Sequence, residues 1–338
     1  MFRTTCQIIA AALFLALSAA PAGERSVTVF TARANATEKE VFKDFETATD
    51  IAVTLVEGKP EELIDRIAKG EGGADLFMTV DGGILETAKQ KGVFGTTDSP
   101  ALREAVPVHL RDNDNAWVGV ATRARVIVYA KDRVRPEQLS TYADLADPKW
   151  KGKVLIRSSG ALYNQSLLAS LIAAYGEEAA GEGARGVAAN LAREPKGGDR
   201  DQAKAVAAGE GDVAVMNSYY IGHMLKSKDE AEAAAAKAVG VFFPDQEAAG
   251  THINICGVGL TKNAENPEDA LKLVEYLLSA PVQEKLSLGN SEFPVNPLAK
   301  KAPLLESWGE FKTQSVDFAE LARNRAKATE ILESTNWK

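Results

Sequence analysis

The chain has 338 residues, a formal net charge of −8 at pH 7 and an ordinary globular composition. An acidic chain without a basic block is not expected to bind nucleic acid. Its length is typical of about two domains.

The first 22 residues have the pattern of a cleaved secretory signal peptide. Arg3 precedes an uncharged apolar run from Ile8 to Leu17, and residues 20–22 form a small-residue cleavage site. The run is too short for a membrane-spanning helix, which needs about 20 apolar residues. We therefore expect residues 1–22 to be removed and the rest of the chain to be exported to the periplasm. Cys256 is then the one cysteine left, so we expect no internal disulfide.

Apolar patterning predicts an alternation of strands and helices along most of the chain. Strands are predicted over residues 26–33, 51–56, 74–79, 117–129, 154–157, 213–217 and 251–260. Helices are predicted to begin near Thr37, Pro60, Gly82, Leu162, Tyr219, Pro267 and Pro281, and to cover residues 177–192, 231–238 and 317–332. Thr37 is expected to cap the first of them. The alternation favours wound α/β sheets.

Two of the predicted strands, 117–129 and 251–260, are long enough to leave one sheet and enter another. We expect both to cross between two wound α/β lobes, which is the bilobal fold of periplasmic binding proteins. The lobes are predicted to comprise residues 23–120 with 250–297, and residues 121–249 with 298–338. Such lobes are hinged and hold their ligand in the cleft between them. The architecture alone does not name the solute.

Three tyrosines are the candidate metal ligands. Tyr219 and Tyr220 follow the predicted strand 213–217 and open a helix, where neighbouring side chains diverge by only about 100°. Both hydroxyls can therefore reach one ion. Tyr163 lies at the start of another predicted helix. Phenolate oxygen is a hard anionic ligand that suits Fe³⁺, whereas the alternative is ordinary aromatic packing at a lobe surface.

Three phenolates neutralise Fe³⁺ but fill only three of six octahedral positions. A carbonate or bicarbonate ion could fill two more if the protein held it. Ser158 or Ser159 is expected to cap the helix that carries Tyr163, and a glycine-containing helix N-terminus is a ready anion site. Arg123, on the predicted crossing strand, is the candidate partner for the anion, although an ordinary salt bridge is the alternative.

Several stretches of the chain resemble the periplasmic ferric-ion-binding proteins, the transferrin-like iron carriers of bacterial ABC importers. They are residues 57–59, 74–82, 117–129, 156–168, 217–220, 250–257 and 293–297. The resemblance implies that Tyr163, Tyr219 and Tyr220 occupy the iron-tyrosinate positions and Arg123 the anion-pairing position, with Ser159, Gly160 and Asn217 around the anion. It also implies a monomer that delivers Fe³⁺ to an inner-membrane ABC permease and its ATPase.

The chain departs from this family in its first lobe. Many relatives carry a His-Tyr pair after the first strand, where this chain has Ala34 and Asn35. Neither side chain replaces a phenolate, so we expect iron to be held by three tyrosines and an anion. Arg33, Asn35 and His223 are expected to surround the site without binding the metal.

Other binding functions are compatible with the same fold. A related binding protein for a phosphonate, thiamine or a polyamine would use the tyrosines as stacking walls, and a sensor would dock to a receptor. His252 and Cys256 are four residues apart on a predicted strand, which separates them by about 13 Å. They cannot form a zinc or nucleophile pair there, and no catalytic triad is recognisable. We therefore do not expect an enzyme.

Overall fold

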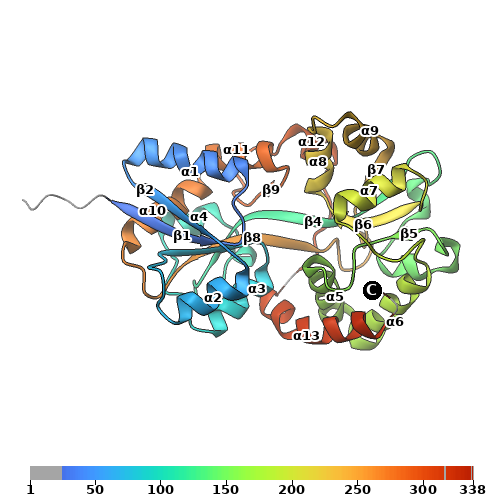
Figure 1. The fold of residues 1–338 in the computed structure, drawn as a ribbon, viewed down its shortest axis with the longest axis horizontal. Helices are drawn as coiled ribbons and strands as arrows, with labels where there is room; N and C mark the ends of the chain where they lie inside the picture. The colour runs from blue at the N-terminus through green and yellow to red at the C-terminus, as the bar shows by residue number, and fades with distance from the viewer. Residues whose placement is uncertain (1–24, 316, 336, 338) are drawn as a thin grey trace, which may run out of the picture.

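One continuous path of hydrogen-bonded strands runs through both lobes of the computed structural model, which describes residues 25–315, 317–335 and 337. The predicted leader, residues 1–22, lies outside the described residues. The strand order is β2-β1-β3-β8-β4-β6-β5, with β7 and β9 also paired to β4. Figure 1 shows the two lobes side by side, with β4 and β8 running between them.

The first lobe contains a mixed sheet. Its strands are β1 (Ser26–Thr31), β2 (Ala52–Glu57), β3 (Leu76–Thr79), β8 (Ile253–Leu260) and β9 (Phe293–Pro294). Strands β1, β2 and β3 are parallel, while β8 is antiparallel to β3. The helices of this lobe are α1 (Ala36–Thr49), α2 (Pro60–Ala68), α3 (Gly82–Gln90), α4 (Pro100–Ala105), α10 (Pro267–Leu278) and α11 (Ala280–Asn290). They cover both faces of the sheet (Figure 1).

Strand β4 (Val118–Ala130) is the element that joins the sheets. Residues 118–124 pair with β8, and residues 125–129 pair with β6 in the second lobe. The crossing predicted for residues 117–129 is therefore confirmed. Strand β8 runs beside β4 between the lobes (Figure 1), but in the described part of the chain it pairs with β3 and β4 and not with the strands of the second lobe. Its chain reaches the first lobe through residues 243–252, between β7 and β8.

The second lobe is built on a smaller sheet. Its strands are β5 (Val154–Leu155), β6 (Val213–Asn217) and β7 (Val239–Phe242), together with the end of β4. Its helices are α5 (Leu162–Tyr175), α6 (Glu177–Ala189), α7 (Asp199–Ala207), α8 (Tyr219–Leu225) and α9 (Glu230–Ala238). Short 3₁₀ turns follow β4 and precede β5: η2 (Pro136–Gln138), η3 (Ala143–Ala146) and η4 (Pro148–Trp150). A further turn, η1 (Val108–Leu110), precedes β4.

The C-terminal segment contacts both lobes. It contains α12 (Pro303–Ser307) and α13 (Phe318–Ser334), and α13 packs along α3 of the first lobe and α5 of the second. Figure 1 shows α13 running beneath both. The predicted lobe ranges, which place residues 298–338 in the second lobe, stay a prediction.

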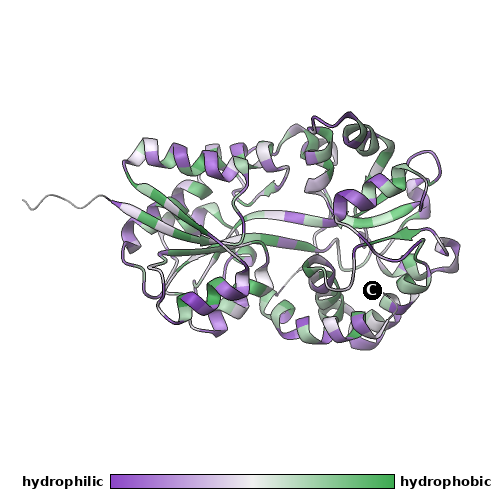
Figure 2. Cartoon of the chain, in the orientation of Figure 1, coloured by the Kyte–Doolittle hydropathy of each residue, from purple (hydrophilic) through white to green (hydrophobic). Residues whose placement is uncertain are grey.

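Buried strands explain why the sheets form where they do. Strands β3, β6 and β8 are buried at every residue. A strand covered on both faces is apolar along its whole length, and Figure 2 shows these strands as predominantly hydrophobic between mixed helices. Among the described residues, no helix is long and apolar enough to cross a membrane.

In α1 the predicted cap was wrong, and helix α7 was missed. Helix α1 is capped by Asn35, not Thr37: the Asn35 side chain accepts from the backbone N–H of Glu38, and the Glu38 carboxylate accepts from the backbone N–H of Asn35. This reciprocal pair is a capping box, which satisfies two backbone N–H groups at the start of the helix. Helix α7 was not predicted, because its small and charged residues carry too weak an apolar period.

Candidate functional site

A cleft of about 360 Å³ lies between the lobes. Its second-lobe wall carries the three predicted tyrosines and His223, and Arg123 of β4 lies between the walls. The first-lobe wall is formed by residues 32–35 and Val80, with Asn290 and Glu292 beside them. The structure thus brings residues from six separate segments of the sequence to one place.

Helix α8 presents two of the tyrosines. Strand β6 ends at Asn217, and Ser218 hydrogen-bonds to the carbonyl of Ala124, so the chain turns directly into the helix. Tyr219 and Tyr220 occupy its first turn with ring centroids 4.2 Å apart. The two rings therefore diverge little and face the same cleft.

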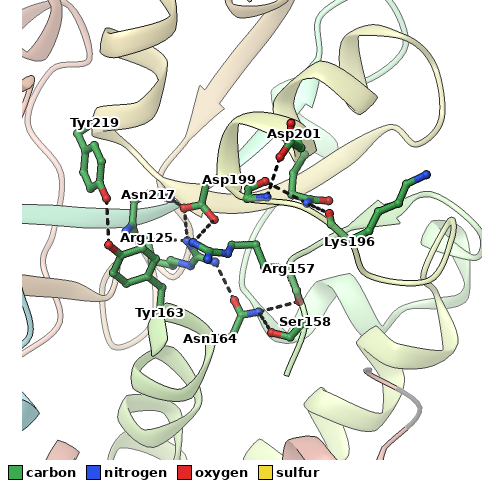
Figure 3. Close-up of polar contacts among 12 residues, drawn as sticks. Arg125, Arg157, Ser158, Tyr163, Asn164, Lys196, Asp199, Asp201, Asn217 and Tyr219 are labelled. Atoms are coloured by element: carbon green, nitrogen blue, oxygen red, sulfur yellow. Dashed lines mark hydrogen bonds and ion pairs between the residues drawn. The ribbon is translucent and has the colours of Figure 1, made fainter. Parts of the chain in front are cut away.

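Tyr163 reaches the same point from α5. The Tyr219 hydroxyl donates to the Tyr163 hydroxyl over 3.3 Å, as Figure 3 shows. Burial, then the neighbouring phenols of Tyr163 and Tyr220, raise the pKa of Tyr219 well above its ordinary value of 10, and burial also raises that of Tyr220. Without a cation these two phenols are neutral at pH 7. A bound cation would reverse that balance, because its charge stabilises phenolate.

Three guanidinium groups surround the ring of Tyr163. The central carbons of Arg123, Arg125 and Arg157 lie 5.6, 5.9 and 5.4 Å from its centroid. The positive charge of these groups favours a negative charge on the phenol oxygen and on an anion bound beside it. The second lobe is thus electrostatically suited to hold anionic oxygen.

One guanidinium nitrogen of Arg123 makes no hydrogen bond within the described part of the chain. The side chain is buried, and its Nη2 donates to the carbonyl of Val80, in the first lobe. Its Nη1 has no hydrogen-bond partner among the described residues. A buried guanidinium N–H without a partner is costly. This atom is therefore available to an anion.

The N-terminus of α5 corrects one prediction. Neither Ser158 nor Ser159 caps the helix: its N-cap is Ala161, which has no side-chain acceptor. The first-turn N–H groups are consequently left without a side-chain partner. Ser159 is partly buried and Gly160 is exposed, and neither lines the cleft. Their predicted role around the anion stays a prediction.

A buried polar network supports the tyrosines from behind. Arg125 donates to Asp199 over 2.7 Å and to Asn164 over 2.7 Å, and its Nη1 lies 3.3 Å from the side-chain oxygen of Asn217. Asp199 also accepts from the backbone N–H of Asn217 over 2.8 Å. Asn164 in turn donates to the carbonyls of Arg157 and Ser158, which fixes the loop before Tyr163 (Figure 3). The network ties β4, α5, β6 and α7 together.

Comparison with known proteins identifies the family to which this architecture belongs. The profile of the bacterial extracellular solute-binding proteins matches residues 72–321. The chain belongs to that family. The relative named Iron uptake protein A1, from Synechocystis sp., is 45% identical over 321 residues, which are 94% of this chain and 89% of the relative.

Solved structures agree with this solute-binding fold. A Trichodesmium protein described as IdiA or FutA, in complex with iron and citrate ligands, is 42% identical with a TM-score of 0.88, over 93% of this chain and 100% of that one. The ferric binding protein from Campylobacter jejuni is 38% identical with a TM-score of 0.86, over 91% and 98%. These findings confirm the predicted fold and family resemblance, and the family is one of solute-binding proteins and not of enzymes.

The first-lobe wall of this solute-binding protein is an ion-pair cluster. Arg33 donates to both carboxylate oxygens of Glu292, over 2.8 and 2.6 Å, and its Nε contacts Glu38. Burial raises the pKa of Glu38 above its ordinary value. Asn35 lines the cleft, but its side-chain oxygen is engaged in capping α1. Ala34 has no side chain that could bind a metal, and none of the described first-lobe lining residues is a tyrosine.

His223 faces the cleft beside Tyr219, with ring centroids 5.5 Å apart. Burial and then Arg200 lower its pKa, so the ring is neutral near pH 7. His252 and Cys256 are both buried, and burial lowers the pKa of His252 to about 4 and raises that of Cys256 to about 12. Among the described residues, no group of three or more His, Cys, Asp or Glu side chains could hold a metal ion.

Sequence reasoning missed several residues of the site. Glu292 borders a stretch that carried the family resemblance, yet nothing in its spacing from Arg33, 259 positions away, predicts their ion pair. The sequence does not indicate the ion pair of Arg125 and Asp199 either, because a buried pair cannot be distinguished from two surface charges before the fold is known.

Proposed function

We propose that this protein is a periplasmic solute-binding protein that captures Fe³⁺ with Tyr163, Tyr219 and Tyr220 and delivers it to an ABC permease. The observation that carries the proposal is the convergence of three phenols in one cleft between two lobes. Deprotonated phenols are hard ligands, and three of them neutralise a ferric ion. The names of the Synechocystis and Campylobacter relatives, which refer to iron uptake and ferric binding, support the choice of metal.

A synergistic anion completes the coordination in this proposal. Arg123 offers an unpartnered buried N–H, and α5 offers the N–H groups of an uncapped first turn. Carbonate would bind the iron through two oxygens and take these donors with the third. The Trichodesmium relative was solved with citrate, which makes an organic carboxylate the competing anion.

Closure and delivery follow from the bilobal fold. Metal binding to the second lobe and contact of Arg123 with the Val80 carbonyl would favour the closed form. We propose that the closed monomer docks on an inner-membrane permease with its ATPase, as the predicted export signal and the solute-binding family suggest.

A visible absorption titration tests the iron site. The protein lacking residues 1–22 would be titrated with a ferric chelate, with bicarbonate, with citrate or with neither. Metal-bound phenolate absorbs visible light, so we expect a coloured one-to-one complex that needs one of the two anions. Tyr219→Phe and Tyr163→Phe should lose or shift the band.

A matched control is Tyr129→Phe, because Tyr129 lies on β4 and does not line the cleft. This variant should keep the parent's band. A parent that stays colourless with both anions would contradict the proposal, and so would a band unchanged in both cleft variants. A band that develops fully without either anion would show that iron binding needs no anion held by Arg123.

A further inference from the structure

A second cavity, of about 290 Å³, lies inside the second lobe. It lies among α5, α6 and the end of α13, is partly open to solvent, and has walls that are almost wholly apolar. Leu167 and Leu168 line it from α5, Ala184 and Val187 from α6, and Trp337 from the C-terminal segment. Its volume is about twice that of the roughly 150 Å³ apolar cavity known to bind benzene. There is room for a small molecule with an apolar body.

One carboxyl group interrupts this apolar lining. Asp245 is 2% exposed and is the only Asp, Glu, Lys, Arg or His among the described lining residues. Its two oxygens accept long hydrogen bonds, from the backbone N–H of Tyr142 over 3.3 Å and from the Tyr175 hydroxyl over 3.4 Å. In the described part of the chain no Lys, Arg or His forms an ion pair with it, unlike the buried Asp199 with Arg125.

An unpaired carboxylate in an apolar cavity is unfavourable unless a cation joins it. Burial raises the pKa of Asp245 to about 6, so at pH 7.5 the group is still mostly ionised. A neutral apolar molecule would leave the charge unpaired, and a carboxylate ligand would be repelled. Only a cation with an apolar body matches both the lining and the charge.

We propose that this cavity binds a small organic cation, whose apolar body lies between α5 and α6 and whose protonated amine pairs with Asp245. The site is separate from the iron cleft: the two share no lining residue, and Asn164, which lines the cavity, is held by its hydrogen bonds to Arg125 and to the carbonyls of Arg157 and Ser158. Asp245 lies in the segment 243–252 that returns to the first lobe, so a bound cation would contact the hinge.

Calorimetric titration with three matched probes tests the site. Benzylamine, benzyl alcohol and benzoate share one ring and differ in charge, and each would be added to the protein without residues 1–22 at pH 7.5. We expect benzylamine to bind at least about tenfold more tightly than benzyl alcohol and benzoate not to bind. In Asp245→Asn the advantage of benzylamine over benzyl alcohol should disappear, because the amide keeps the shape and lacks the charge.

Two further measurements locate the ligand. Ala184→Leu narrows the cavity and should weaken benzylamine by about tenfold, whereas Ala189→Leu, on the exposed side of the same helix, should not. In the nitrogen–proton spectrum of labelled protein, which has four tryptophans, the indole signal of Trp337 should shift most. Trp337→Phe identifies that signal by its loss.

The proposal is overturned if benzylamine does not bind the parent, if it binds Asp245→Asn as tightly, or if the Trp337 signal stays still on binding. Ferric titration of Asp245→Asn gives an independent readout. A normal visible band in a variant that has lost benzylamine binding keeps the two sites distinct.

Discussion

Acid should release the metal steeply if the three phenols are its ligands. A tyrosine ordinarily titrates near pH 10, and burial raises the pKa of Tyr219 and Tyr220 further. On the proposed ligand set, each phenol would therefore lose a proton when Fe³⁺ binds near neutral pH. Three released protons make the apparent affinity fall by up to about a thousandfold for each unit of pH decrease. Tyr220→Phe removes one of them, so its slope should be about a hundredfold per unit.

Competition with a chelator of known pH dependence measures these slopes. The protein would be loaded with Fe³⁺ at a fixed free anion concentration and titrated with the chelator between pH 5.5 and 7.5, and the visible band would report occupancy. Tyr129→Phe should keep the parent's slope. A parent affinity that is flat across this range, or a Tyr220→Phe slope equal to the parent's, would refute the reasoning from phenolate ligands.

Three other predictions concern buried groups. Asp199→Asn should lower the free energy of unfolding by about 3–5 kcal/mol, since it leaves Arg125 buried without its counter-ion; urea unfolding measures this, and the exposed Glu310→Gln is a control whose midpoint should not move. A similar loss in both variants would mean that the Arg125 network contributes little. Cys256 should resist a thiol reagent at pH 8 in the native protein and react once urea is added, because burial raises its pKa to about 12; rapid native labelling would contradict this. Burial lowers the pKa of His252 to about 4, whereas a histidine in the unfolded chain titrates near pH 6.5. The free energy of unfolding should therefore fall by about 3 kcal/mol as the pH drops from about 6.5 to 4. In His252→Gln the unfolding midpoint should change less over that range, and an unchanged pH profile would show that another group is responsible.

The sequence predicted much of the fold because local patterns determined it. Helices α5 and α8 begin at the predicted residues and strand β6 has the predicted bounds, since an apolar run or period has a clear boundary there. Helix α7 escaped detection, and the predicted serine cap of α5 was wrong. In both places the local signal was weak, and contacts with distant segments decide the structure.

The sequence by itself determined the bilobal α/β class, the family and the presence of the three tyrosines together with the absence of a fourth at Ala34. These follow from residue types and short-range order. Only the tertiary structure decided that Tyr163 and Tyr219 meet, that Arg33 is bound to Glu292, and that Asp245 lies alone in an apolar cavity. The reason is physical: the energy of a buried charge depends on its neighbours after folding, and those neighbours come from segments far apart in the chain.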